Sequence, residues 1–250
     1  MKSIIVSFFL FISGPLPAQD VHFFIQQAAQ SETDMNDVRA IQKYKEVLKI
    51  QPNNIPAICK LSELCSRVGA RLKDDKAKQA DYFAAARTYA QIAIKLDSLN
   101  SDANFVMALV MGREAMQRGG RDKIMAVKDV KRYADLSIKY DPQNFKAWFI
   151  LGKWYYEVSA LNYFERTAVR IFFGALPKAG INDAIFCFEK SKSLNPGFIL
   201  NYLTLAKSYK RKDDEMMAKQ NLAVLISLPE KTEDDARFKS EGRELLKKWN

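Results

Sequence analysis

The sequence of 250 residues is poor in the side chains from which catalytic and metal sites are usually built. Its single histidine, His22, stands near the N-terminus, and there is no histidine-based triad, no His-Glu zinc pair and no CxxC pair. The three cysteines are an odd number and are expected at buried, small hydrophobic positions: Cys59, Cys65 and Cys187. These shortages predict a protein that is not an enzyme and that needs neither a metal nor a cofactor.

Glycine-rich loops and runs of like charge are missing as well. No G-x-x-x-x-G-K or G-x-G-x-x-G loop is present to hold a phosphate or a dinucleotide. The formal net charge is +10, but it is spread along the chain, so nucleic acid binding is not expected. Acidic pairs at predicted helix starts indicate helix capping rather than acid–base catalysis: Asp74-Asp75, Asp213-Asp214 and Asp234-Asp235.

The apolar run that stands out lies at the N-terminus. Lys2 precedes apolar residues 4–12, and Ala18 provides a small residue before the expected cleavage point. The run is too short to span a bilayer, and no later run is long and apolar enough. We therefore expect residues 1–18 to be a signal peptide and residues 19–250 to be exported, as a periplasmic or secreted protein. The alternative is that the segment is retained as an anchor or packs as a buried first helix.

What the sequence does contain is a repeated helical pattern. Residues 147–155 read W-x2-L-G-x2-Y, the signature of the first helix of a tetratricopeptide repeat. Trp148, Leu151 and Tyr155 fall on one helical face, and Gly152 lets a neighbouring helix approach closely. A repeat helix cannot bury this face alone, so stacked neighbours are expected, with Trp148 buried at a seam between them.

The second-helix signature, A-x3-F/Y-x2-A-x4-P, closes four units at positions 52, 98, 142 and 196. These positions are further apart than the standard period of about 34 residues. The additional residues fall inside the units, between the first and second helices, at roughly 69–80, 115–125 and 160–180. The predicted repeats are 21–54, 55–100, 101–144, 145–198 and 199–232, followed by a capping helix over 233–250.

The pattern therefore predicts an all-α fold. It is a single tetratricopeptide-repeat-like superhelix of antiparallel helix pairs, with long insertions in the middle repeats. The alternative is an irregular helical bundle with alanine-rich seams.

Several segments resemble the regulator of microtubule dynamics family. They are the stretches 151–158, 174–179, 183–190 and 194–198, which include a Leu-Pro-Lys-Ala turn in the extended fourth repeat. The resemblance is strongest over about 140–250. It implies a divergent, all-helical tetratricopeptide domain and a binding role. Together with the N-terminal segment, it indicates an exported relative whose partner is not a microtubule.

The first function hypothesis is a non-catalytic scaffold that binds a protein or peptide in a concave groove. The first helices of the repeats line such a groove, and helical phase predicts six residues on it: Lys146, Phe149, Lys153, Tyr156, Lys207 and Lys210. Lysines beside aromatic rings suit an extended chain that carries carboxylates, so an acidic partner is favoured. The other interpretation is that these are ordinary solvated or packing residues.

The second hypothesis is a carrier of a lipid or another hydrophobic ligand. The stretched fourth unit is rich in aromatic residues, which predicts a wider gap between its helices and an apolar cavity there. These residues are Trp154, Tyr155, Tyr163, Phe164, Phe172 and Phe173. The other interpretation is that the rings fill a larger core.

Overall fold

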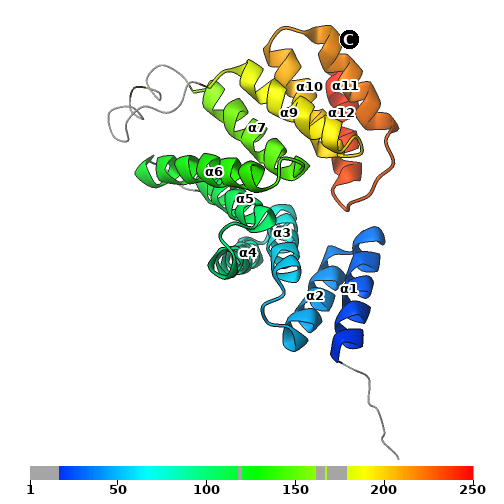
Figure 1. Cartoon of the computed structure of the whole chain (residues 1–250). Helices are drawn as coiled ribbons and strands as arrows, with labels where there is room; N and C mark the ends of the chain where they lie inside the picture. The colour runs from blue at the N-terminus through cyan, green and yellow to red at the C-terminus, as the bar shows by residue number, and fades with distance from the viewer. Residues whose placement is uncertain (1–16, 118–119, 162–166, 168–178, 250) are drawn as a thin grey trace, which may run out of the picture.

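The computed structural model describes residues 17–117, 120–161, 167 and 179–249. These residues form eleven α-helices and no strand, labelled as in Figure 1: α1 (Pro17–Thr33), α2 (Asp37–Ile50), α3 (Ile55–Arg71), α4 (Lys76–Leu96), α5 (Ser101–Gln117), α6 (Gly120–Tyr140), α7 (Phe145–Ser159), α9 (Ile181–Leu194), α10 (Ile199–Arg211), α11 (Glu215–Ser227) and α12 (Asp235–Trp249). They pack in consecutive pairs, α1 with α2, α3 with α4, α5 with α6, α7 with α9 and α10 with α11, and α12 covers the last pair. The predicted all-α repeat superhelix is confirmed.

Short polar residues fix where many of these helices begin. The side chains of Asn36, Asn54, Asp75, Asn144 and Asp214 each accept a hydrogen bond from a backbone N–H in the first turn of the helix that follows. Such caps satisfy backbone donors that have no partner inside the helix. The capping role predicted for the acidic pairs is therefore confirmed at Asp75 and Asp214.

Small residues line the seams between paired helices. Alanines at the predicted second-helix positions are at most 1% exposed: Ala40, Ala86, Ala90, Ala134, Ala184 and Ala218. On α7, a Cβ atom placed on Gly152 would lie 2.7 Å from the ring of Phe188 on α9. Only glycine permits this approach, as the repeat signature predicts. Phe188 itself is completely buried.

The prediction that Trp148 is buried at a seam is wrong. The side chain is half-buried, its indole nitrogen donates to the Pro142 carbonyl at 2.9 Å, and its ring meets the exposed Phe186 edge-on. Trp148 packs at the outer edge of the seam around Leu151 and Cys187, which it covers rather than fills. The tryptophan of α7 that is buried is Trp154, which is 4% exposed.

The additional residues of the second unit lengthen its helices. The connection from α3 to α4 spans only residues 72–75, and α4 is 21 residues long. In the third unit α6 is also 21 residues long, while residues 118–119 lie outside the described part. The third predicted insertion, at 160–180, lies almost wholly outside the described residues.

The N-terminal apolar run, residues 4–12, also falls outside the described residues, and α1 begins at Pro17. Across the described helices, none is both long and apolar enough to span a membrane. The three cysteines are free and buried, as predicted. Figure 1 shows the chain curving so that the turn before α12 comes back toward α3 and the α1–α2 pair.

Candidate functional site

A stripe of charged side chains runs along α3, a helix that is otherwise largely buried. Lys60, Glu63, Arg67 and Arg71 follow at intervals of three or four residues and so share one helical face. Their partners come from α1, α2, α7 and the turn before α12. We call this stripe and its partners the inner charged face, because segments from both ends of the chain converge on it.

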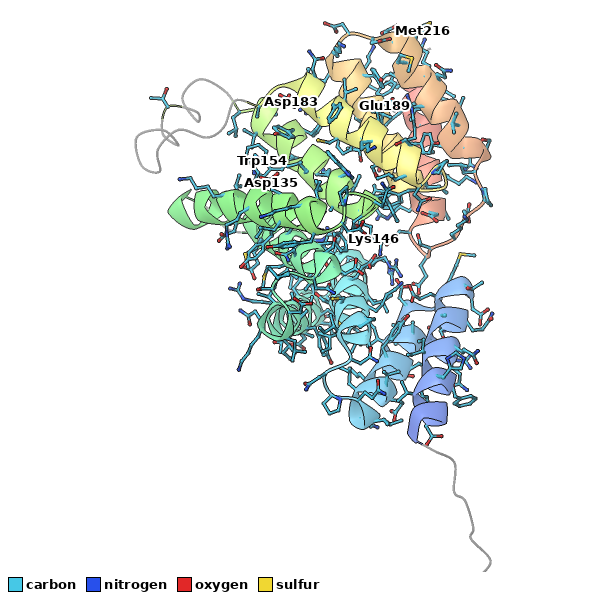
Figure 2. The ribbon with its side chains drawn as sticks, viewed as in Figure 1. Asp135, Lys146, Trp154, Asp183, Glu189 and Met216 are labelled. Atoms are coloured by element: carbon cyan, nitrogen blue, oxygen red, sulfur yellow. The ribbon has the colours of Figure 1, made fainter. Side chains whose placement is uncertain are left out.

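One half of the inner charged face is a ladder of ion pairs from α1 to α7. Lys60 Nζ lies 2.9 Å from Glu32 Oε2, and Lys146 Nζ lies 2.5 Å from Glu63 Oε2. Burial alone would raise the pKa of Glu63, but Lys146 and Lys60 bring that pKa down to about 2. Lys146 also lies over the ring of Phe105, 5.5 Å from its centroid. Figure 2 labels Lys146 where α7 comes close to α3.

The other half is built around Asp37, which is 1% exposed. Arg67 binds both of its carboxylate oxygens, with Nε–Oδ2 and Nη2–Oδ1 distances of 2.7 and 2.5 Å. Arg71 Nη2 lies 2.8 Å from Asp37 Oδ2 and 3.0 Å from Glu233 Oε2, while Nη1 lies 3.3 Å from Asp234 Oδ2. Burial disfavours charge on Arg67, but the bonds to Asp37 hold its pKa above the ordinary value.

A third arginine, Arg113 of α5, reaches the same region. Its Nε donates a long hydrogen bond of 3.4 Å to Ser66 Oγ, and within the described ranges it forms no ion pair. Burial lowers the pKa of Arg113, and the charge of Asp234 acts against that shift. Arg67, Arg71 and Arg113 together are called the arginine cluster below. Arg113 is the member with donors to spare for a further anion.

Phe149 does not face an open groove, in contrast to the position that helical phase predicts for it. The side chain is 7% exposed. Its ring centroid lies 5.7 Å from that of Phe188 and 4.9 Å from that of Phe198. The close approach of α9 that Gly152 permits turns this face of α7 into core.

Lys153 Nζ lies 5.7 Å from the ring centroid of Tyr156, and neither residue contacts the arginine cluster among the described interactions. Lys153 forms an exposed pair with Glu157, with 3.1 Å between Nζ and Oε1. The guanidinium of Arg211 stacks on Tyr156 at 3.6 Å from the ring centroid and donates to its backbone carbonyl at 2.8 Å. This cation–aromatic cluster joins α7 to α10.

Lys207 and Lys210 are already engaged within the chain. Lys207 forms an ion pair with Glu241 of α12. Lys210 forms one with Glu215 at the start of α11 and lies over the ring of Trp249, 5.7 Å from its centroid. All four lysines predicted as binding residues thus have a carboxylate partner. The structure brings only Lys146 into the inner charged face.

The cysteine thiols are poor nucleophiles in this fold. Burial is the main cause that raises the pKa of Cys59 and of Cys187 to about 12 and that of Cys65 to about 11. A thiol with such a pKa is protonated at neutral pH, and the reactive species is the thiolate. The inner charged face, in contrast, can recognise charged groups.

Sequence reasoning missed Lys60, Glu63, Arg67 and Arg71. A signal was present, because a charged residue at every third or fourth position of an otherwise apolar helix marks a polar face. Asp234 was predicted to cap a helix, but it binds Arg71 instead. Its neighbour Asp235 does not bind the first turn of α12 either, because its Oδ2 accepts from the backbone N–H groups of Lys231 and Thr232, before the helix, at 2.9 and 2.8 Å.

Paired helices stacked around an inner polar face define a tetratricopeptide-type scaffold. The fold is similar to that of a thermophilic TPR protein of Thermus thermophilus, with a TM-score of 0.63, 12% identity, and coverage of 92% of this chain and 99% of that one. It is also similar to that of Pseudomonas aeruginosa pilF, with a TM-score of 0.55, 13% identity, and coverage of 93% and 90%. At these identities the likeness shows the fold alone.

The chain belongs to the regulator of microtubule dynamics family, since the family model described as "Regulator of microtubule dynamics protein 1-3" matches residues 24–250. It is 26% identical over 185 residues to Regulator of microtubule dynamics protein 3 of Bos taurus, covering 74% of this chain and 38% of that protein. It is 29% identical over 162 residues to Regulator of microtubule dynamics protein 1 of Caenorhabditis elegans, covering 65% and 72%. The chain thus spans less than half the length of the bovine relative. The resemblance expected from the sequence is confirmed.

Proposed function

We propose that this protein is a non-catalytic scaffold, exported from the cytoplasm, that binds a protein or peptide segment rich in carboxylates on its inner charged face. One observation carries the proposal. The arginine cluster already receives carboxylates from two distant parts of the chain, Asp37 and the pair Glu233 and Asp234. A planar guanidinium binds carboxylates through paired N–H donors, so the same surface suits an acidic peptide.

Binding of acidic peptides to the full chain tests this proposal. The probes are fluorescent 12-residue peptides of mixed Asp, Glu, Gly and Ser, unrelated to this chain, compared with versions in which amides replace the carboxylates. Fluorescence anisotropy should show binding of the acidic peptides only, and added salt should weaken it.

Arg113→Gln should weaken binding of the acidic peptides about tenfold, because a charged hydrogen bond contributes roughly 1.5–3 kcal/mol. It should leave the fold intact, since Arg113 has no ion-pair partner in the described residues. Arg243→Gln, a change of the same charge on the exposed face of α12, is the control. Equal binding of acid and amide peptides, or unchanged binding by Arg113→Gln, would place the partner elsewhere, with the Tyr156–Arg211 cluster as the next surface to examine.

The lipid-carrier alternative has less support. Trp154 is buried and its indole nitrogen donates to the Val127 carbonyl at 2.7 Å, so this ring fills core. The hollow beside it, of about 510 Å³, is open, and most of the residues that line it are charged residues of α6, including Asp135 (Figure 2). Tyr163, Phe164, Phe172 and Phe173 lie outside the described residues. A carrier would co-purify with bound lipid, which native mass spectrometry of the full chain detects.

A further inference from the structure

The turn that precedes α12 bridges the two ends of the superhelix. Its residues Glu233 and Asp234 pair with Arg71, and Glu233 Oε1 also accepts from the backbone N–H of Asp37 at 2.5 Å. Asp37 is the first residue of α2, so Glu233 sits at a helix N-terminus, where the helix dipole favours an anion. Two side chains therefore occupy a site that combines a helix N-terminus with an arginine.

The roles within the turn are divided between neighbouring residues. Asp235 shapes the turn, because its carboxylate binds the backbone N–H groups of Lys231 and Thr232. Lys239 Nζ holds the connection by donating to the Leu228 carbonyl at 2.6 Å. Glu233 and Asp234 project toward α2 and α3, and Asp234 Oδ1 also accepts from Arg237 Nη2 of α12 at 3.1 Å. This turn before α12, with Glu233 and Asp234, is called the acidic turn below. Its shape is fixed by contacts on the α12 side, and it contacts the N-terminal repeats through carboxylates.

The contact between the acidic turn and the N-terminal repeats is polar. The hydrophobic cluster of α1–α5 and that of α10–α12 share no residue in the described ranges. The Arg71 and Glu233 side chains are 21% and 28% exposed, so water screens their ion pair in part, whereas Asp234 is 8% exposed. Release of the turn leaves Arg67 and Arg71 paired with Asp37, so no guanidinium loses its last partner. Opening therefore exposes the two carboxylates to water and leaves no buried charge of this contact unpaired.

We infer that Glu233 and Asp234 occupy, within the same chain, the site where an acidic partner binds, so that the partner must displace the turn and open the contact between the two ends of the superhelix. The inference rests on the proposed function. It adds the regulation of that function: the free protein is closed, and the partner has to carry two neighbouring carboxylates that replace those of the turn at Arg71 and the start of α2.

The test compares three full-length proteins. These are the wild type, the latch variant Glu233→Gln/Asp234→Asn, and the control Asp213→Asn/Glu244→Gln. The control loses the same two kinds of carboxylate from exposed positions whose side chains form no ion pair with another described residue. Asp213 has a φ of 62°, a conformation that asparagine also tolerates. The probe is a fluorescent peptide with the sequence of residues 228–238, and the same peptide carrying Glu233→Gln and Asp234→Asn is its negative counterpart.

The latch variant should bind the acidic peptide at least about tenfold more tightly than the wild type, which is the factor expected if the wild-type site is open one tenth of the time. The control should bind as the wild type does. Small-angle X-ray scattering should show a larger radius of gyration for the latch variant than for the other two proteins. Glu233→Gln alone, at the more exposed side chain, should shift both readouts in the same direction and serves if the double variant does not fold.

Equal binding by all three proteins would overturn the inference, and so would equal binding of the acidic peptide and its amide counterpart to the latch variant. Neither result depends on the unrelated acidic peptides or on Arg113→Gln. If the unrelated acidic peptides still bind through their carboxylates, the proposed function stands and only the displacement of the turn is rejected. If they do not bind, the proposed function and this inference both fail.

Discussion

At the scale of single residues, Glu63 shows how the inner charged face is linked to stability. Its pKa in the folded protein is about 2, below the ordinary value of 4.5. A carboxylate with a depressed folded pKa stabilises the native state fully above its unfolded pKa, and this contribution is lost as the pH falls through the folded pKa. The window for Glu63 therefore lies between about pH 4.5 and pH 2.

We expect urea denaturation to show a steeper loss of unfolding free energy over this window in the wild type than in Glu63→Gln. The variant should also be less stable at pH 7, because Lys146 and Lys60 lose their shared partner. Glu46→Gln, which breaks the surface pair with Lys49, is the matched control and should behave as the wild type. Parallel pH dependences for the wild type and Glu63→Gln would show that Lys146 does not hold this carboxylate charged.

At the scale of elements, the seam between α7 and α9 has one aromatic side chain buried at its centre and another that covers its edge. Phe188 lies at the centre, completely buried against Gly152 and Phe149. Trp148 lies at the edge, where its indole reaches the Pro142 carbonyl. The cost of truncating a side chain depends on the cavity left behind, so the two positions should differ although both are large aromatic residues.

Phe188→Ala should lower the free energy of unfolding by roughly 3–5 kcal/mol. Trp148→Ala should lower it by about 1–2 kcal/mol, within the usual range for partly exposed sites. Chemical denaturation monitored by circular dichroism gives both values. A larger cost at Trp148 than at Phe188 would mean that the tryptophan, and not the phenylalanine, fills the seam.

At the scale of the whole molecule, the apolar N-terminal run predicts export, and cleavage after Ala18 would leave a chain that starts within the first turn of α1. N-terminal sequencing of protein from its native host should then find Gln19 at or near the start, in a periplasmic or secreted fraction. Recovery of Met1 in a cytoplasmic fraction would contradict this and restore a cytoplasmic partner, such as the family's name suggests, as the first candidate.

The sequence by itself determined the elements and their pairing. Helical periodicity, the caps at Asn54 and Asn144, and the close approach at Gly152 are local, so each is readable from a few neighbouring residues. Of the six residues predicted to bind a partner, Lys146 is the one that pairs with the charged stripe of α3. Sequence reasoning misplaced Phe149 and Trp148, because both lie on one helix and only the rotation of α7 against α9 decides which is buried.

Only the tertiary structure decided that the two ends of the superhelix meet. Glu233 and Asp37 are 196 positions apart, and no local pattern joins them. Their contact depends on the curvature that accumulates over five helix pairs, to which each helix–helix packing contributes a small rotation. In the sequence, Arg67 and Arg71 are therefore recognisable only as part of a charged stripe on α3. Its carboxylate partners, and with them the acidic turn as its occupant, follow from the way the pairs stack.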